Sequence, residues 1–275
     1  MKISHRVEAI MSSKSISMVA RVAELQKKGI PIISLCVGQP DMPPPEEVME
    51  EMYLAQKRDN CGYGPVSGHP VLREKLAEQF GKAVKRPIRS ENILISNGSK
   101  QIIYNLFQTL IDPGDEVIVP SPYWVTFPES IKLAGGKAVF VPCLTTHQLD
   151  LSAIRRAIGP ATRAIILNSP NNPTGAIYNS DDIFQILQWA EQFNFVVISD
   201  EAYAFLTYDQ KTFTSPLTLL KNYDTEDLLN RVLTVQTFSK SYAMTGYRVG
   251  FLVASSVLIK KIEAPGGGSY DTDAG

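Results

Sequence analysis

Residues 232–255, VLTVQTFSKSYAMTGYRVGFLVAS, place an apolar run on each side of a polar loop. The first run, 232–237, leads into a turn that contains a lysine, and the second, 250–255, begins at a glycine. Both runs are rich in β-branched residues and almost continuously apolar, which is typical of strands covered by helices on both faces. The stretch therefore predicts two buried strands joined by a loop that carries polar side chains.

Five more apolar runs of the same kind precede this stretch. They lie at 92–96, 116–120, 137–142, 163–168 and 195–200. Most are separated by helical or mixed segments, such as 100–110 and 180–193. This alternation predicts an α/β fold with three layers, α/β/α, around a mostly parallel sheet of about seven strands.

The chain before residue 92 has a different pattern. Residues 16–28 carry apolar side chains at helical spacing and stop at Gly29, a common helix terminator. The short apolar run 32–38 predicts a further strand, and 46–57 and 70–85 predict two helices.

Composition and charge narrow the class of protein. Of the 275 residues, 44% are apolar and 20% charged, as in ordinary soluble globular proteins. The net charge of −1 gives no reason to expect nucleic acid or an anionic membrane as a partner, and no apolar run reaches the length of a membrane span. Cys36, Cys61 and Cys143 are odd in number and lack metal-ligand spacing, which favours a cytoplasmic protein without a metal site.

The loop after the 232–237 run contains Lys240 and, eight positions later, Arg248. A lysine held out of bulk water can exist as an amine and condense with a carbonyl group. The planar guanidinium of an arginine can bind two phosphate oxygens at once. Taken alone, a lysine at a strand end is an ordinary solvated residue, so the hypothesis depends on the other segments.

Asp200 and Tyr203 follow another apolar run, in the sequence SDEAY. Ligand sites of open α/β sheets lie beyond the carboxyl ends of the strands. An aspartate buried there needs a cationic partner, and a protonated pyridine nitrogen would serve, with the tyrosine donating to a ring oxygen. The alternative for the same segment is a helix-capping aspartate beside a core tyrosine.

Three further segments are compatible with the same chemistry. The motif NSPNNPTG (168–175) and the motif SNGSKQ (96–101) both follow predicted strands. Backbone N–H groups at the helix start after the second motif suit a phosphate, and Trp124 in PSPYW offers a ring for stacking. Each also has an ordinary interpretation, as a turn, a helix start and a core tryptophan.

Taken together, these segments resemble the class I and II aminotransferases, which are fold type I pyridoxal-phosphate enzymes. The motifs NSPNNPTG, SDEAY, FSK with GYRVG, PSPYW and YGP (63–65) occur in that family's order, and Lys240 follows Asp200 by 40 residues, similar to the family's interval. The resemblance covers residues 1 to about 263. It implies pyridoxal 5′-phosphate as cofactor, an amino acid and a 2-oxo acid as substrates, and a homodimer.

The resemblance implies a role for each matching residue. Lys240 would hold the cofactor as a Schiff base and move a proton between substrate and cofactor, while Asp200 would pair with the pyridine nitrogen. Tyr203 and Asn172 would contact the ring oxygen, and Trp124 would stack on the ring face. The phosphate would be bound by Arg248, Thr237, Ser239 and the backbone of Ser99 and Lys100. Tyr63 would come from a second subunit. Thr237 and Ser239 stand where the family varies.

Substrate contacts are implied for Gly38, Lys100, Trp124 and Asn172. Gly38 matches a backbone position near the substrate α-carboxylate. In one aspartate aminotransferase subgroup, a lysine at the position of Lys100 meets the distal carboxylate, which favours aspartate or glutamate as amino donor. A surface lysine at a helix start is the alternative. A prephenate-type acceptor is also open, since Ser15 falls near a position linked to it.

The resemblance divides the chain into an N-terminal arm that normally joins a small domain (1–45), a cofactor-binding large domain (46–263) and a Gly-rich tail (264–275). The composition of the tail predicts disorder or a non-native junction. The family continues beyond Ala264 by about a hundred residues, with the small domain and the arginine that clamps the substrate α-carboxylate. We therefore expect a nearly complete cofactor site and an incomplete substrate site.

Two other functions stay open at this point. One is a truncated paralogue that binds pyridoxal phosphate but is catalytically impaired. The other is a lyase or synthase of the same fold that uses the same cofactor.

Overall fold

The computed structural model describes residues 2–8, 10, 14–58, 62–219 and 224–266. Its centre is a seven-stranded sheet in the order β1-β7-β6-β5-β4-β2-β3. The strands are β1 (Ile93–Ser96), β2 (Glu116–Ser121), β3 (Lys137–Pro142), β4 (Thr162–Asn168), β5 (Val196–Asp200), β6 (Val232–Thr237) and β7 (Gly250–Val253). Strands β2 to β6 run parallel, and β7 is antiparallel to both of its neighbours. The predicted α/β fold with a mostly parallel seven-stranded sheet is confirmed.

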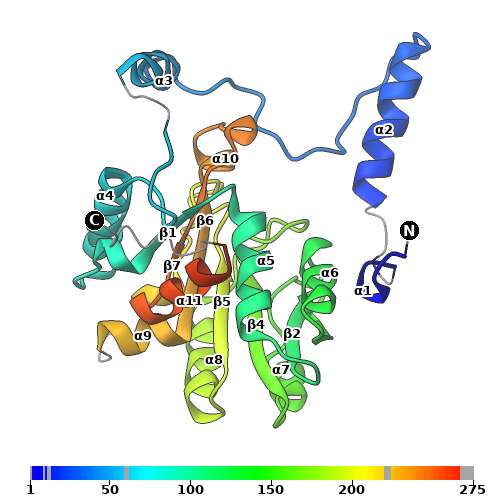
Figure 1. The fold of residues 1–275 in the computed structure, drawn as a ribbon. Helices are drawn as coiled ribbons and strands as arrows, with labels where there is room; N and C mark the ends of the chain where they lie inside the picture. Colours follow the sequence, from blue (N-terminus) through cyan, green and yellow to red (C-terminus); the bar gives the residue numbers. More distant parts are fainter. Residues whose placement is uncertain (1, 9, 11–13, 59–61, 220–223, 267–275) are drawn as a thin grey trace.

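Helices cover both faces of the sheet (Figure 1). One face packs against α5 (Ser99–Leu110), α6 (Thr126–Leu133) and α11 (Ser256–Gly266). The other packs against α4 (Pro70–Val84), α7 (Leu151–Ala157), α8 (Ser180–Gln192) and α9 (Thr225–Arg231). Successive strand residues point to opposite faces, so Val197 lies in one core and Ile198 in the other, both fully buried. This two-sided burial explains the nearly continuous apolar runs of the sequence.

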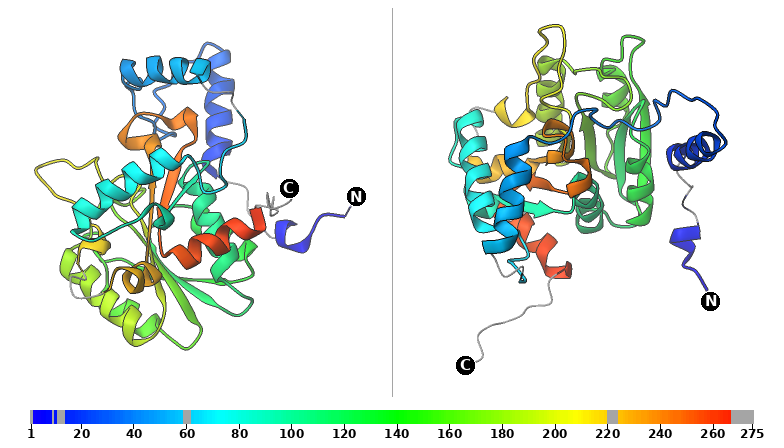
Figure 2. Two further views of the ribbon diagram at one scale, coloured as in Figure 1. Left: turned by 60° about the vertical axis from the view of Figure 1, so that its left-hand side comes forward. Right: turned by 90° about the horizontal axis from the view of Figure 1, so that it is seen from above.

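The N-terminal part lies outside these layers. It comprises α1 (His5–Glu8), α2 (Lys14–Lys27), an extended segment and α3 (Glu46–Arg58). Figures 1 and 2 show α2 and α3 standing away from the body of the sheet, joined by that extended segment. None of the residues of α3 is buried.

The strand predicted at 32–38 is wrong, because this segment is a loop without a strand partner among the described residues. Ile33 and Leu35 are 94% and 92% exposed. An apolar run predicts burial, whereas a strand also needs a neighbour that takes its backbone hydrogen bonds. The loop instead brings Gly38 to the carboxyl end of β6.

Short elements complete the fold. They are the helical turn α10 (Phe238–Ser241) and the 3-10 turns η1 (Ser90–Asn92), η2 (Pro216–Thr218) and η3 (Thr245–Tyr247). Helix α11 continues to Gly266, so the first three residues of the predicted tail are helical, and residues 267–275 lie outside the described residues. Within the described ranges, no helix has both the length and the apolarity needed to cross a membrane.

Candidate active site

The carboxyl ends of β4, β5 and β6 open onto a cavity of about 900 Å³. Parallel strands present their C-terminal residues at one edge of the sheet, which is where ligands bind in open α/β folds. Every site residue predicted from the sequence lines this cavity except Tyr63. The lining residues among them are Gly38, Ser99, Lys100, Trp124, Asn172, Asp200, Tyr203, Thr237, Ser239, Lys240 and Arg248.

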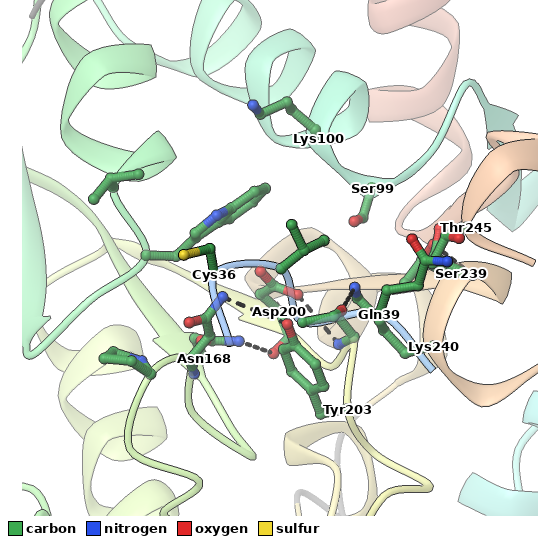
Figure 3. Close-up of a pocket in the computed structure, with 18 of the residues that line it drawn as sticks. Cys36, Gln39, Ser99, Lys100, Asn168, Asp200, Tyr203, Ser239, Lys240 and Thr245 are labelled. Carbon is green, nitrogen blue, oxygen red and sulfur yellow. Dashed lines mark hydrogen bonds between the residues drawn. The ribbon is translucent and has the colours of Figure 1, made fainter. Parts of the chain in front are cut away.

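The turn that follows β6 carries Lys240 into the cavity (Figure 3). Thr237 caps this turn, because its hydroxyl accepts a hydrogen bond of 3.1 Å from the backbone N–H of Ser239. The Lys240 amine donates to the carbonyl oxygen of Gly38 and lies 5.9 Å from the centroid of the Tyr203 ring. Burial, and then the charge of Arg248, lower the pKa of Lys240. Both effects favour the neutral amine, which is the nucleophilic form.

Asp200 is the last residue of β5, and its side chain is almost completely buried, with 2% of the residue exposed. The carboxyl accepts a hydrogen bond of 3.2 Å from the backbone N–H of Ala202, and no cation pairs with it in the described part of the chain. Burial raises the pKa of Asp200 to about 7, and the neighbouring Glu201 adds to the rise. A positively charged N–H donor in the cavity would relieve this desolvation.

Tyr203 and Asn172 form a pair on the same wall of the cavity. The Asn172 side-chain amide lies 3.4 Å from the Tyr203 hydroxyl, and the Asn172 backbone N–H donates to the Asn168 side chain over 2.7 Å. Burial, and then the charge of Asp200, raise the pKa of Tyr203. The phenol therefore stays protonated and can donate to an anionic oxygen.

Arg248 and the first turn of α5 form the cationic end of the cavity. The Arg248 guanidinium donates to the carbonyl oxygen of Thr245 over 2.9 Å and to the Ser239 hydroxyl over 3.4 Å. A side chain at position 98 would place its Cβ 2.4 Å from the guanidinium, and Gly98 has a φ of +85°. Glycine at that position therefore lets the guanidinium lie beside the start of α5, where Ser99 lines the cavity.

Lys100 and Trp124 occupy another part of the lining. The Lys100 amine lies 5.6 Å from the centroid of the Trp124 ring, which packs edge-on against Phe127. This part of the lining therefore combines a flat apolar ring with a positive charge.

Tyr63 is fully exposed and lies outside the cavity lining. Its expected contribution to the site of a second subunit stays a prediction. The side chain of Ser15 lies outside the described residues, as does Cys61. The lining residues that sequence reasoning missed include Cys36, Gln39, Asn168 and Thr245. Asn168 could have been found, because it begins the NSPNNPTG motif at a strand end. Cys36 and Gln39 lie in a loop and Thr245 begins the 3-10 turn η3, and none of these three has a local signal.

Comparison with known proteins identifies the family to which this chain belongs. The family model described as aminotransferase class I and II matches residues 30–268. The chain belongs to the class I and II aminotransferase family. The aspartate/prephenate aminotransferase of Thermus thermophilus is 38% identical over 260 residues, which cover 94% of this chain and 65% of that protein. The aspartate aminotransferase of Thermotoga maritima is 37% identical over 267 residues, covering 95% of this chain and 69% of that protein.

Solved structures of the family agree with the fold. The crystal structure of the Thermotoga maritima aspartate aminotransferase gives a TM-score of 0.88 at 36% identity, over 95% of this chain and 68% of that one. The structure of the Thermus thermophilus aspartate aminotransferase with maleate gives a TM-score of 0.88 at 37% identity, and the match covers 96% of this chain and 68% of that one. The chain spans about 65% of the length of the first curated relatives that it matches.

Enzymes of this aminotransferase family use pyridoxal 5′-phosphate. The donors and acceptors of the cavity fit that group. A buried carboxyl without a cation suits a protonated ring nitrogen, a half-buried amine of lowered pKa suits an aldehyde, and the Arg248 end suits a phosphate dianion.

Proposed function

We propose that this chain is the main part of a pyridoxal-phosphate-dependent aminotransferase, which moves an amino group from an amino acid to a 2-oxo acid. The single observation that carries the proposal is the convergence of Lys240, Asp200 and Arg248 on one cavity at the carboxyl edge of the sheet. Amine, acid and guanidinium are the three groups needed to hold an aldehyde, a pyridine nitrogen and a phosphate.

In this proposal Asp200 holds the ring nitrogen in its protonated form, and Arg248, Ser239 and the backbone of α5 hold the phosphate. Thr237 contributes to the phosphate site by accepting a hydrogen bond from the backbone N–H of Ser239, which caps the turn that carries Ser239. The bound ring supplies an electron sink for the negative charge that develops when the substrate α-carbon loses its proton. Asp200 supports that role because its buried carboxylate stabilises the positive nitrogen.

The remaining residues act on the ring substituents and on the proton. Tyr203 and Asn172, whose side chains lie 3.4 Å apart, both contact the ring oxygen. Trp124 stacks on the ring face. Lys240, once its amine is free, would take the α-proton of the substrate at Nζ and deliver it to the cofactor carbon that carried the aldehyde, which requires the neutral form that burial favours.

A dicarboxylic amino acid such as aspartate or glutamate is the proposed donor, with 2-oxoglutarate or oxaloacetate as acceptor. The Lys100 amine projects into the same cavity beside Trp124 and can meet a distal carboxylate. Gly38 offers its backbone for the α-carboxylate. The similar Thermus thermophilus enzyme has been solved with maleate, which is itself a dicarboxylate, and this supports the choice of substrate class.

We further propose that the protein is a cytoplasmic homodimer. The exposed Tyr63 supports the dimer, because this side chain is useful to the cofactor site only if it reaches a neighbouring subunit. The division into an N-terminal arm (1–45), a cofactor-binding domain (46–263) and a tail (264–275) belongs to the same proposal.

Arg248 is the one arginine among the described residues that lines the cavity. If it holds the phosphate, the described part of the site has no second guanidinium for the substrate α-carboxylate. This observation favours a second candidate function, a chain that binds the cofactor but is catalytically impaired.

Titration with pyridoxal phosphate, followed by addition of aspartate, tests both candidates. The proposal predicts a visible absorption band that is absent in Lys240→Ala and that shifts when aspartate is added. A band that forms and never shifts with amino acids supports the impaired chain. A Lys240→Ala protein with an unchanged band contradicts the cofactor site itself.

A further inference from the structure

Glu201 is a fully buried acid that the proposed chemistry does not use. It follows Asp200 directly, and both residues are 2% exposed. Because successive residues of an extended chain point to opposite faces, Glu201 faces away from the cavity that Asp200 lines. Its backbone N–H donates to the carbonyl oxygen of Val235 over 2.9 Å, which continues the β5–β6 pairing past the end of β5.

The Glu201 carboxyl is held by three neutral donors. One carboxyl oxygen accepts from the Ser199 hydroxyl over 3.0 Å and from the Ser215 hydroxyl over 2.6 Å, and the other accepts from the Gln236 amide over 3.0 Å. No lysine, arginine or histidine in the described ranges forms an ion pair with it. A buried carboxyl of this kind is costly to desolvate and is a poor source of stability. We therefore look for the role of the Glu201 carboxyl in the segments that its three hydrogen bonds join.

The three donors lie on three different segments of the site. Ser199 belongs to β5, which ends at Asp200, and Gln236 precedes Thr237, the cap of the turn that presents Lys240. The contact between Glu201 and Gln236 therefore joins β5, which ends at Asp200, to β6, which leads to the turn that carries Lys240. This contact lies on the face of the sheet opposite to the one that the Asp200 side chain faces.

Ser215 connects the third segment. The loop of residues 202–214 follows Glu201 and ends at Ser215, which precedes the 3-10 turn η2, so the 2.6 Å hydrogen bond between Ser215 and Glu201 closes the base of the loop. Tyr203 lies in the first turn of this loop. One carboxyl thus holds the two ends of the Tyr203 loop together.

We propose that Glu201 is a positioning residue for the cofactor site, which sets the relative places of Asp200, Tyr203 and the Lys240 turn through its three hydrogen bonds. This inference rests on the proposed function, since it concerns the same cavity. The role belongs to the hydrogen bonds and not to the charge. Glutamine at this position can keep them, because its carbonyl accepts both hydroxyls and its amide can donate to Gln236 after the Gln236 amide turns over.

The test compares Glu201→Leu, Glu201→Gln and a matched control, Thr234→Val, in the full chain. Thr234 is fully buried on the same face of β6, and its hydroxyl has no hydrogen-bond partner among the described residues. For each variant, the dissociation constant of pyridoxal phosphate and the visible circular dichroism of the bound cofactor are measured, together with the thermal unfolding midpoint. The dichroism reports the orientation of the ring, which a loss of stability alone does not change.

Glu201→Leu is expected to weaken cofactor binding by about tenfold or more and to alter the visible dichroism, because three buried donors lose their acceptor. Glu201→Gln should recover most of the affinity and the wild-type dichroism, and Thr234→Val should match the wild type. If Glu201→Leu does not fold, Ser215→Ala removes only the loop contact and should weaken binding by roughly threefold.

A folded Glu201→Leu protein with wild-type affinity and dichroism overturns the inference, as does a Glu201→Gln protein as impaired as Glu201→Leu. If Glu201→Leu does not fold, wild-type cofactor affinity and dichroism in Ser215→Ala would also overturn the inference. Absence of any cofactor band in the wild type contradicts the proposed function instead, so the two failures can be told apart.

Discussion

Asn168 and Asp200 lie opposite each other in register at the ends of β4 and β5, and the Asn168 side-chain amide donates to the Asp200 carbonyl oxygen over 3.1 Å. Each residue belongs to a polar motif, NSPNNPTG for Asn168 and SDEAY for Asp200. Their pairing brings the two motifs to one wall of the cavity, where Asn172 and Tyr203 then meet. The sheet register therefore assembles the ring-binding side of the proposed site.

Replacement of Arg248 by alanine should remove the preference for a phosphorylated cofactor. The wild type should bind pyridoxal phosphate at least about a hundredfold more tightly than pyridoxal, because a guanidinium binds a phosphate dianion through charge-assisted hydrogen bonds. In Arg248→Ala the ratio of the two dissociation constants should fall toward one, while Arg156→Ala, an exposed arginine of α7, should keep it. A ratio unchanged in Arg248→Ala would place the phosphate elsewhere.

The stability of the cofactor-free protein should depend on the ionisation of Asp200. Its pKa is raised in the folded state, from an ordinary value of 3.8 to about 7. The buried acid therefore contributes most to stability below pH 3.8, and this contribution is lost as the pH rises through about 7. Glu201 has a dependence of the same sign. Because both acids contribute, the effect of Asp200 is measured as the difference in unfolding midpoint between the wild type and Asp200→Asn at each pH.

The unfolding midpoints of the two proteins should diverge as the pH rises, with cofactor-free Asp200→Asn the more stable above the folded-state pKa. Added pyridoxal phosphate should raise the midpoint of the wild type more than that of the variant, because a ring nitrogen partner restores the favourable environment of the charge. A wild type that gains stability relative to Asp200→Asn with rising pH would show that Asp200 has a cationic partner within the protein.

Gly250→Ala should damage the phosphate end of the site and the fold together. A Cβ at this position would lie 2.5 Å from the backbone nitrogen of Ser99 and 2.7 Å from the backbone carbon of Gly98, and neither atom can move without shifting α5. We expect a loss of stability of about 2 kcal/mol or more and weaker cofactor binding. Gly159→Ala is the matched control, because a Cβ there meets nothing within 4 Å. Equal unfolding midpoints for the two variants would contradict the close approach of β7 and α5.

Lys100→Ala should weaken the binding of dicarboxylates selectively. The amine is the proposed partner of the distal carboxylate, whereas the phosphate contact of Lys100 uses its backbone. The affinity for maleate, measured by its effect on the visible band, should fall by about tenfold, while the affinity for pyridoxal phosphate stays near the wild-type value. If the affinity for maleate is unaffected, the substrate class proposed from Lys100 is wrong.

Much of the fold could be predicted because two-sided burial leaves a strong signal. The runs that became β3 and β6 were predicted with their observed bounds, 137–142 and 232–237. The antiparallel placement of β7 could not be predicted, since a buried strand has the same composition in either direction. The loop at 32–38 was mistaken for a strand because Ile33 and Leu35 are apolar yet exposed.

The candidate site was predictable where a chemically distinctive residue ends a strand, as Asp200 does, or directly follows one, as Lys240 does. Contacts between segments far apart in the sequence were not predictable. The approach of Gly38 to Lys240 spans 202 positions, and no local pattern indicates it. The network around Glu201 was missed for the same reason, because serine and glutamine donors have no distinctive spacing.

The most direct test of the central claim is to locate the covalent bond to the cofactor. The full chain is incubated with pyridoxal phosphate and reduced with borohydride, and the modified peptide is then sequenced by mass spectrometry. A pyridoxyl group on Lys240, and none on the Lys240→Ala protein, is the predicted result. Modification spread over exposed lysines such as Lys75 and Lys82, with Lys240 unmodified, would contradict the account.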